Sequence, residues 1–490
     1  MKNLVIIGAG VSGLVAGVYA QRSGFRTVIL ERAANPGGVS TSWKRKGYFF
    51  EGGIHWLIGS AKGLPLNDLW SEVGALGENN PVYFKDPVYT LVDKEGSVAL
   101  YRRLSKLKEA FPEDRFFLDL LRFETWCFSF FHPVLVDPWG LKVRYPRRFN
   151  PLEFVKMLPA LLLAPALLLE SVPGYLRRFR NPRLRYLLSA VVNSAHINAL
   201  SLIYTLSTFA YGDSGYPEGG SLRMVNNMAS KFTSLGGEIR YRTSALQVLR
   251  AADGTVTGVR TEAGDIPADA VIISADARSA IDHLFAEPLQ DGWAKKMRKG
   301  LHTTQCLFFG MGVHTDLSAY PRSMQIPFPE PLKLGNLRLG NVIVNNYARE
   351  MNYAPEGCTT LTMVITAPAS YDYWRQARED GSYAEKKAEV TATLLAMVEK
   401  VIPEIRGKVD VTDLATPVTY ARYCDTFEGS YMTDWVPGSI TPTAPVRYAR
   451  GIYFAGQRTS LSGGLPIAGT SGRKAVQSLC KDFDSEFVSR

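Results

Sequence analysis

The sequence predicts an α/β fold, with a Rossmann-type nucleotide-binding domain assembled from discontinuous segments of the chain and a second α+β domain. Three observations predict it: an apolar run leading into a glycine-rich turn near the N-terminus, a second apolar run ending in Glu31, and a strand–glycine turn–helix pattern at the far C-terminus. At 490 residues the chain is too long for one ordinary core, so two intertwined domains are expected.

Composition places the chain among folded proteins, since 46% of its residues are hydrophobic and 11% are aromatic. The five cysteines are scattered and form no C-x-x-C pair, which argues against a disulfide framework or a zinc site, so we expect no metal and a reducing compartment. The first apolar stretch, Leu4 to Ile7, leads straight into glycines. We therefore expect no signal peptide and a cytoplasmic protein.

The net charge of +10 is concentrated in one part of the chain. Residues 142–185 contain ten Lys or Arg and only two acids, Glu153 and Glu170. These positive charges lie on both sides of an apolar run, and positive charge is not distributed over the chain as expected for a nucleic-acid-binding surface. We expect no nucleic-acid partner.

The first segment turns at Gly8-x-Gly10-x-x-Gly13 and then predicts a helix. In such a turn one glycine makes the bend, one lets a pyrophosphate approach the backbone, and one lets helix and strand pack closely. The N–H groups of the helix N-terminus attract an anion. We therefore place Gly8, Gly10, Ser12 and Gly13 at a dinucleotide.

The second strand, residues 27–30, ends at Glu31 and Arg32. A carboxylate at this position binds ribose hydroxyls and repels a 2′-phosphate, which disfavours NADP. The alternative is that Glu31 is simply a solvated residue at a strand end.

Pro36-Gly37-Gly38 follows, and then Phe50-Glu51-Gly52-Gly53-Ile54-His55. From these motifs the chain resembles the FAD-containing flavoprotein oxidoreductases, whose pattern runs from the ribose acid through a Gly-Gly pair to an acid-x-Gly loop near the flavin. The resemblance implies FAD as cofactor, with Gly37, Gly38 and Gly53 beside it. The usual acid of the loop is Asp, and here it is Glu51.

The C-terminal segment predicts a strand at Ile452 to Ala455, a turn, the loop Gly463-Gly464-Leu465-Pro466, and a helix. It resembles the closing segment of the same flavoproteins. That resemblance places Gln457 at the ribityl or pyrophosphate part. It also assigns four neighbours to the cofactor site: Gly456, Gly464, Pro466 and Ile467. An ordinary strand–helix pair is the alternative.

Residues 216–277 predict a glycine entry, an amphipathic helix, a strand ending near Val248, a hairpin, and a buried strand at Val271–Ile273. In flavoproteins of this kind the block returns the chain to the nucleotide sheet, and we assign Val248 to the cofactor site. The FAD domain is then expected at 1–75, 212–285 and 445–490. The substrate domain is expected at 76–211 and 286–444.

Three motifs narrow the resemblance: Tyr216-Pro217-x-Gly219-Gly220, the Gly463-Gly464-Leu465-Pro466 turn, and residues 415–432. The chain resembles the carotenoid desaturase, carotenoid isomerase and retinol saturase group. The resemblance implies an FAD-dependent enzyme acting on carbon–carbon double bonds of a long lipophilic polyene, first of all by desaturation. A saturase or a reduced-flavin isomerase is the close alternative. A flavin amine oxidase-like enzyme or a non-catalytic lipid-binding flavoprotein is more distant.

Met157 to Leu169 is an almost pure Leu/Ala/Pro run. Its thirteen residues fall short of the roughly 20 that span a bilayer, so we expect a monotopic, membrane-associating helical patch. Five arginines follow and are expected to contact anionic headgroups: Arg177, Arg178, Arg180, Arg183 and Arg185. The alternative is a buried core helix of the substrate domain.

His55 is the candidate catalytic residue, because it follows the loop expected at the flavin and an imidazole there could move a proton. The alternative is a histidine that only holds the loop. Gly310-x-Gly312 lacks the rest of a second dinucleotide motif, so a dedicated NAD(P)H domain is not expected. Electrons are expected to leave to a quinone or to oxygen.

Overall fold

The computed structural model describes residues 1–78, 80–132, 135–148, 150–194 and 196–490. Its first unit is built on a six-stranded sheet in the order β11-β2-β1-β15-β23-β22. Five strands are parallel and β22 is antiparallel to β23. The strands are β11 (Glu238–Arg240), β2 (Arg26–Leu30), β1 (Asn3–Ile7), β15 (Ala270–Ile273), β23 (Ile452–Phe454) and β22 (Arg447–Ala449).

These strands come from three separated parts of the chain, as the sequence predicts. Helices α1 (Val11–Arg22), α9 (Gly220–Ser234) and α15 (Leu465–Asp482) share one apolar core with β1 and β2. The antiparallel strands β12 (Ala245–Arg250), β13 (Val256–Thr261) and β14 (Gly264–Pro267) pack with β15 in a second core. The predicted helix, hairpin and buried strand of the middle block are confirmed.

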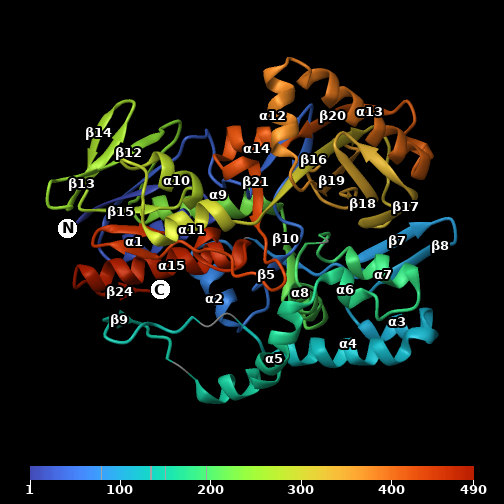
Figure 1. Cartoon of the computed structure of the whole chain (residues 1–490), viewed down its shortest axis with the longest axis horizontal. Helices are drawn as coiled ribbons and strands as arrows, with labels where there is room; N and C mark the ends of the chain where they lie inside the picture. Colours follow the sequence, from blue (N-terminus) through green and yellow to red (C-terminus); the bar gives the residue numbers. More distant parts are fainter. Residues whose placement is uncertain (79, 133–134, 149, 195) are drawn as a thin grey trace.

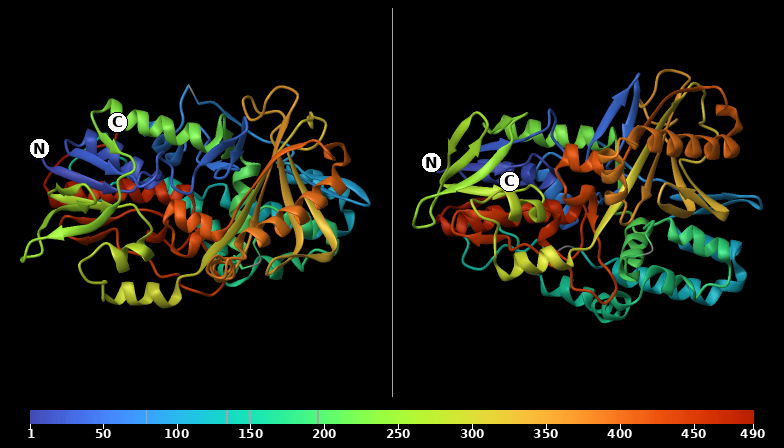
Figure 2. Two further views of the ribbon diagram at one scale, coloured as in Figure 1. Left: turned by 90° about the horizontal axis from the view of Figure 1, so that it is seen from above. Right: turned by 45° about the horizontal axis from the view of Figure 1, so that its top comes forward.

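The second unit is built on an eight-stranded sheet at the opposite end of the long axis (Figure 2). Its order is β20-β16-β19-β18-β17-β7-β8, with β21 also paired to β16. The strands are β20 (Val409–Ala415), β16 (Thr303–Val313), β19 (Thr359–Thr366), β18 (Leu337–Asn346), β17 (Ser323–Leu334), β7 (Tyr89–Asp93), β8 (Gly96–Leu100) and β21 (Ser430–Thr433). Helices α12 (Tyr371–Glu379) and α13 (Tyr383–Val401) pack against it through Trp374, Val390 and Leu394.

A group of helices lies below this sheet, from the bottom centre to the lower right of Figure 1. It contains α4 (Arg115–Phe128), α5 (Pro151–Leu169), α6 (Val172–Leu176), α7 (Pro182–Ser189) and α8 (Ala199–Ala210). Their buried residues form one apolar cluster that also takes in Tyr89 and Leu91 of β7. The second unit is therefore α+β.

The helix that contains the apolar run begins before the run itself. Helix α5 has 19 residues because Asn150 caps it, accepting the Leu152 N–H at 3.0 Å, and because Pro151 occupies the first turn, where its missing N–H costs nothing. By length and composition α5 is able to cross a membrane, and it is the one such helix in the described part of the chain. The expected length of thirteen residues therefore underestimates the helix, while its contact with a membrane stays a prediction.

Most of α5 is not covered by protein. Only 17% of its most apolar window is buried, through Met157, Ala160 and Leu167, while Leu162 is 80% exposed and Leu169 is 71% exposed. A core helix would bury most of its apolar surface, so the core-helix alternative does not fit.

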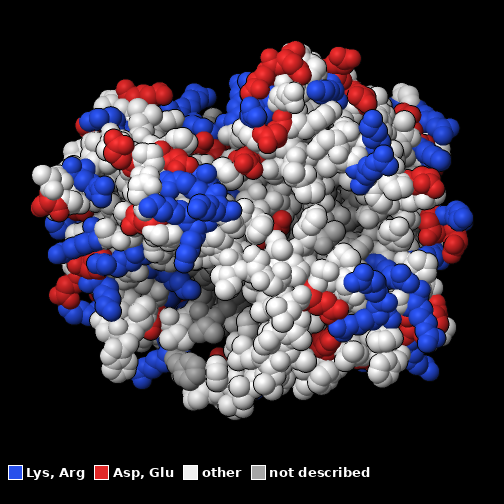
Figure 3. Space-filling model, viewed as in Figure 1, with Lys and Arg blue, Asp and Glu red and all other residues white. Residues whose placement is uncertain are grey.

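The five arginines after α5 do not form a free basic row. Arg178 pairs with Glu170 at 2.5 Å, Arg183 pairs with Asp93 at 2.9 Å, and Arg185 donates to the Phe179 and Arg180 carbonyls. In Figure 3 the lower edge, where α5 lies, has few charged side chains, and Lys and Arg gather to its right over α6 and α7. The expectation that all five arginines contact lipid headgroups is corrected, because three of them form ion pairs or hydrogen bonds within the protein.

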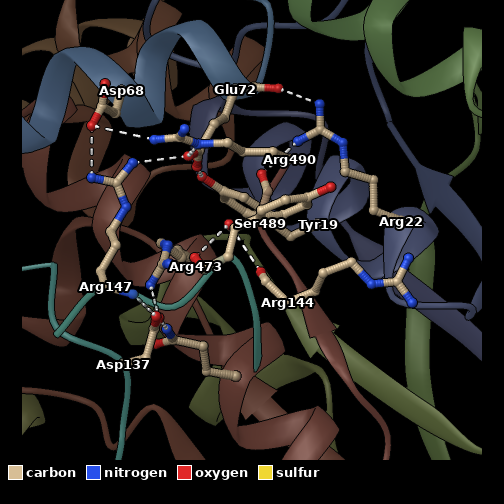
Figure 4. A network of polar contacts seen from close by, with 12 residues as sticks. Tyr19, Arg22, Asp68, Glu72, Asp137, Arg144, Arg147, Arg473, Ser489 and Arg490 are labelled. Atoms are coloured by element: carbon tan, nitrogen blue, oxygen red, sulfur yellow. Dashed lines mark hydrogen bonds and ion pairs between the residues drawn. The ribbon is translucent and has the colours of Figure 1, made fainter. Parts of the chain in front are cut away.

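The segment before α5 runs back over the first unit. Its strand β9 (Val143–Arg144) pairs with β24 (Phe487–Val488) at the C-terminal end of the chain. Arg147 contacts Asp68 and Glu72, both at 2.8 Å, and the buried Asp137 accepts from Arg473 of α15 at 2.7 Å (Figure 4). This network joins the segment before α5 to the helix Pro65–Glu72 and to α15.

Candidate functional site

A cavity of about 1350 Å³ opens over the carboxyl ends of β1, β2, β15 and β23. Ligands of open α/β sheets bind at this edge, and the volume exceeds the roughly 300–1000 Å³ of ordinary ligand pockets. Its wall contains most of the residues expected at the cofactor: Gly8, Gly10, Ser12, Glu31, Arg32, Gly37, Gly38, Gly53, Gly456, Gln457 and Gly464.

The turn after β1 has the predicted form. Gly8 has a φ of +101°, Gly10 caps α1, and Val11 and Ser12 of the first helical turn line the cavity. Gly13 does not line the cavity. It lies directly against the turn, where an added Cβ would collide with the Gly8 carbonyl oxygen. Gly13 therefore allows the helix to pack against the turn, while the N-terminus of α1 is the part that faces an anion.

Glu31 is buried at the end of β2 and is held by backbone donors. One carboxylate oxygen accepts the Ala9 N–H and the other accepts the Ala33 N–H, both at 2.8 Å. Each oxygen keeps a further lone pair that could accept a ribose hydroxyl. A buried carboxylate at this place would oppose a phosphate, so the discrimination against NADP stays a prediction.

The N-terminus of α15 supplies a second set of backbone N–H groups. Gly464 caps this helix, and Leu465 and Ala468 line the cavity. Pro466 and Ile467 are not among the lining residues, because the helical twist turns Leu465 and Ala468, three residues apart, toward the cavity; the contact of Pro466 and Ile467 with the cofactor stays a prediction. Gln457 is held by β21, since its Oε1 accepts the Thr433 N–H at 3.2 Å.

Val248 does not reach the cavity either. Its side chain is 3% exposed within the core of β12–β15, and its N–H donates to the Leu284 carbonyl at 2.8 Å. The start of the same strand, Ala245 and Leu246, lines the cavity instead. The strand was predicted correctly, but the assigned residue lies too far along it.

Two residues of the wall, Asp276 and Arg458, were not predicted from the sequence. They form a buried ion pair at 2.9 Å, in which the side chains are 3% and 2% exposed. Burial raises the pKa of Asp276, but Arg458 and two backbone N–H donors outweigh it, so that the net pKa is lowered. No motif identifies a pair 182 positions apart, although Arg458 directly follows Gln457.

Aromatic side chains form another part of the wall: Trp43 from β3 (Ser42–Arg45), Tyr420 and Tyr423 from α14 (Pro417–Cys424), and Tyr431 from β21. The Tyr431 hydroxyl donates to the Gly53 carbonyl at 2.8 Å, which fixes the loop that follows Glu51. Flat apolar surfaces of this kind suit a planar ring system.

Glu51 does not line the cavity and has a structural role. It is fully buried and accepts the N–H groups of Gly53 and Ser221 at 2.8 Å, together with the Ser221 hydroxyl at 2.5 Å. Its pKa is raised by burial, against the effect of these donors. Gly220 has a φ of +63° and any Cβ there would collide with this carboxylate, so the Glu51 loop and the start of α9 fit only with glycine.

His55 lies beyond this loop, in a separate small pocket with Trp56 and Lys85. Its Nδ1 is buried without a hydrogen-bond partner. Burial, with a smaller effect of Lys85, lowers the pKa of His55 to about 3. The imidazole is therefore neutral at physiological pH.

The chain has curated relatives along almost its whole length. It is 24% identical over 451 residues to the chloroplastic prolycopene isomerase of Daucus carota, covering 88% of this chain and 71% of that protein. It is 24% identical to a lycopene-forming phytoene desaturase of Pseudescherichia vulneris, covering 99% of this chain and 100% of the relative. A neurosporene-forming phytoene desaturase of Rhodobacter capsulatus is 23% identical over 97% of this chain and 94% of the relative.

Solved structures share the fold at low identity. An oxidoreductase from Methanosarcina mazei superposes with a TM-score of 0.63 at 15% identity, over 97% of this chain and all of that one. Putrescine oxidase gives 0.61 at 14% identity, with 99% of each chain covered. The family described as flavin containing amine oxidoreductase matches residues 11–480. The match covers most of the chain, and the cavity, with two helix N-termini and a buried carboxylate at the end of β2, is large enough for FAD; the chain belongs to this family and is an FAD-dependent oxidoreductase.

Proposed function

We propose that the protein desaturates a long lipophilic polyene of the carotenoid type. The observation that carries this proposal is the similarity to phytoene desaturases over 97–99% of the chain, because it includes the second unit and not only the nucleotide-binding sheet. The amine oxidases with a similar fold are 14% identical to this chain and support the fold alone.

Bound FAD supplies the acceptor for a hydride leaving an allylic carbon. The chain's own residues would bind the cofactor and keep water away from the reacting carbon atoms. Glu31 and the two helix N-termini bind the cofactor, and the aromatic wall excludes water from the site where charge develops on the polyene. No polar acid–base pair is needed for the hydride step itself.

His55 is the residue that we propose takes the proton lost from the neighbouring carbon. It follows Gly53 of the cavity wall by two positions, and its neutral imidazole has an unpartnered Nδ1. We expect His55→Ala to retain FAD and to lose about 10²–10⁴-fold in turnover. Normal FAD content together with normal turnover would eliminate this role and leave His55 as a residue that holds the loop.

A reduced-flavin cis–trans isomerase is the second candidate, because four relatives that match 88–100% of this chain are prolycopene isomerases. Addition of hydrogen by a saturase belongs to the same chemistry with the electron flow reversed. The three reactions differ in electron balance.

We also propose that the enzyme draws its substrate from a membrane through α5. The exposed apolar surface of this helix and its position beside the apolar cluster of α4 and α8 support this. A membrane position would bring a quinone within reach as electron acceptor, and oxygen is the alternative.

The test is anaerobic incubation of the FAD-loaded protein in liposomes with a panel of polyenes, followed by flavin absorbance and product mass. Flavin bleaching with a product lighter by two hydrogens supports desaturation. A product heavier by two hydrogens from pre-reduced enzyme would mean a saturase, and an unchanged mass with altered retention would mean an isomerase. No change with any polyene would overturn the proposal in favour of amine oxidation or a binding role.

A further inference from the structure

The small pocket behind the Glu51 loop lies between the cofactor cavity and the helices around α5. Gly53 lines the cofactor cavity, whereas His55 and Trp56 line the pocket. The Trp56 ring meets the Phe209 ring of α8 edge-on at 5.3 Å, and both pack in the apolar cluster of α4, α5 and α8. The pocket has a volume of about 20 Å³, enough for one water molecule or one oxygen atom of a ligand.

Lys85 is the charged residue of this pocket. Its Nζ lies 5.0 Å from the centre of the Tyr216 ring, and no described carboxylate lies within 4 Å of it. The neighbouring Glu350 is already paired with Arg322 and accepts the Tyr83 hydroxyl. Burial lowers the pKa of Lys85 to about 8, so the ammonium form still predominates at neutral pH.

Three other polar side chains of the pocket are hydrogen-bonded within the protein. Ser323 of β17 donates to Asn345 of β18 at 3.0 Å, and Ser214 of β10 (Ser214–Pro217) donates to Thr208 at 2.7 Å. The His55 Nδ1 has no partner. The pocket therefore presents to whatever enters it the Lys85 ammonium group, which has no described hydrogen-bond or ion-pair partner, whereas the His55 Nδ1 is sealed within its wall.

A pure hydrocarbon in this pocket would leave the Lys85 ammonium group unpaired. A buried donor or acceptor without a partner costs about 1–3 kcal/mol, and more for a charged group. An oxygen atom accepting from Lys85 would replace a water molecule of the same size and regain the hydrogen bond. The pocket is thus suited to a ligand that is apolar along its chain and polar at one atom.

We infer that this pocket binds an oxygen atom at one end of the polyene substrate, as a hydroxyl, aldehyde or carboxylate, with Lys85 as the donor. The inference rests on the proposed function and narrows its substrate class from hydrocarbons to oxygenated polyenes. Lys85 acts here in substrate specificity and takes no part in the transfer of hydrogen.

The test is a binding titration of the FAD-loaded, full-length protein in detergent micelles. The ligands are all-trans conjugated polyenes of one chain length, ending in methyl, hydroxymethyl, aldehyde or carboxylate, and binding is followed by the shift in polyene absorbance. The variants are Lys85→Met, Lys85→Gln, which keeps a hydrogen-bond donor, and Lys62→Met at an exposed position as matched control. FAD content and melting temperature establish that each variant is folded.

We expect the wild type to bind at least one oxygenated polyene about 10–100-fold more tightly than the hydrocarbon. Lys85→Met should abolish this preference without changing hydrocarbon affinity, Lys85→Gln should restore part of it, and Lys62→Met should keep it in full. Equal affinity for hydrocarbon and oxygenated ligands in the wild type would overturn the inference and leave the proposed function standing. An equal loss for all ligands in Lys85→Met would assign Lys85 a structural role, and failure of every polyene to bind would overturn both proposals.

Discussion

The Asp276–Arg458 ion pair joins three parts of the chain at the cofactor cavity. Arg458 also donates to Thr433 at 2.6 Å and to Ser430 at 2.5 Å, both in β21, while Asp276 accepts the Phe427 N–H. Because both charges are buried, removal of one leaves the other uncompensated. The pair therefore fixes the distance between β15, β21 and the turn after β23.

Arg458→Met should lower the free energy of unfolding by about 3–5 kcal/mol at pH 7, since Asp276 would be left buried and charged. In the wild type the depressed pKa of Asp276 gives stability above the unfolded pKa of about 3.9, and this is lost as pH falls through the folded pKa. In the variant burial still raises that pKa and only the two backbone donors oppose it, so the deficit should shrink from pH 7 to pH 5 as Asp276 protonates.

Urea unfolding across this pH range measures the effect. Asp276→Asn combined with Arg458→Met should be less destabilised than Arg458→Met alone. Arg260→Met, which breaks a half-exposed pair with Asp265, is the matched control and should cost less than about 1 kcal/mol. A deficit that is constant with pH would show that Asp276 is not the group left uncompensated.

Site residues that belong to a local sequence motif could be predicted from the sequence. Site residues that are brought together only by the tertiary fold could not. Gly8, Gly10 and Glu31 have the predicted positions because a strand, a turn and the next strand fix them within thirty residues. Val248 was misplaced because the pattern gives a strand but not which of its residues meets the cavity. Asp276 and Arg458 have no local signature, since a buried charge is recognised by its partner.

At the scale of single elements, α5 shows how a cap extends a helix. Composition marks the apolar run from Met157, but the helix begins at Pro151 because Asn150 caps it, which adds a turn and a half before the run. The prolines at 159 and 165 do not end it. The element type could be predicted, and its length depended on polar residues outside the apolar pattern.

Membrane binding is predicted to depend on the exposed face of α5. Leu162→Glu combined with Leu169→Glu places two charges where the helix would contact acyl chains, at a cost of about 2.5 kcal/mol or more each. We expect the fraction bound to phosphatidylcholine vesicles in a flotation assay to fall at least about tenfold. FAD content should be unchanged, because neither residue lines the cofactor cavity.

Met351→Glu is the control, since Met351 is 75% exposed on a loop of the second unit. It should float with vesicles as the wild type does. If the α5 variant also floats like the wild type, α5 is not the membrane contact and its exposed surface meets another partner.

At the scale of the whole molecule, the cofactor cavity lies where the three segments of the first unit meet. Its wall contains residues from β1–α1, from the turn after β15 and from the turn after β23. Arg147 donates to Glu72 and Arg473 of α15 donates to Asp137, so the segment before α5 is also held against this unit (Figure 4). Segments so far apart in sequence have a large closure entropy, so a ligand that contacts all three favours their assembly.

Removal of FAD should therefore destabilise the protein as a whole. At a free FAD concentration 100 times its dissociation constant, binding adds about 2.7 kcal/mol to the free energy of unfolding, so the melting temperature of the apoprotein should rise on addition of FAD and depend on its concentration. Glu31→Ala loses the ribose-side carboxylate and should need a higher FAD concentration for the same rise, whereas Glu287→Ala, at an exposed position, should match the wild type. Differential scanning calorimetry of apoprotein, titrated protein and both variants makes the measurement. If Glu31→Ala responds to FAD as the wild type does, Glu31 only fastens the turn between Ala9 and Ala33, and the cofactor is held by the helix N-termini alone.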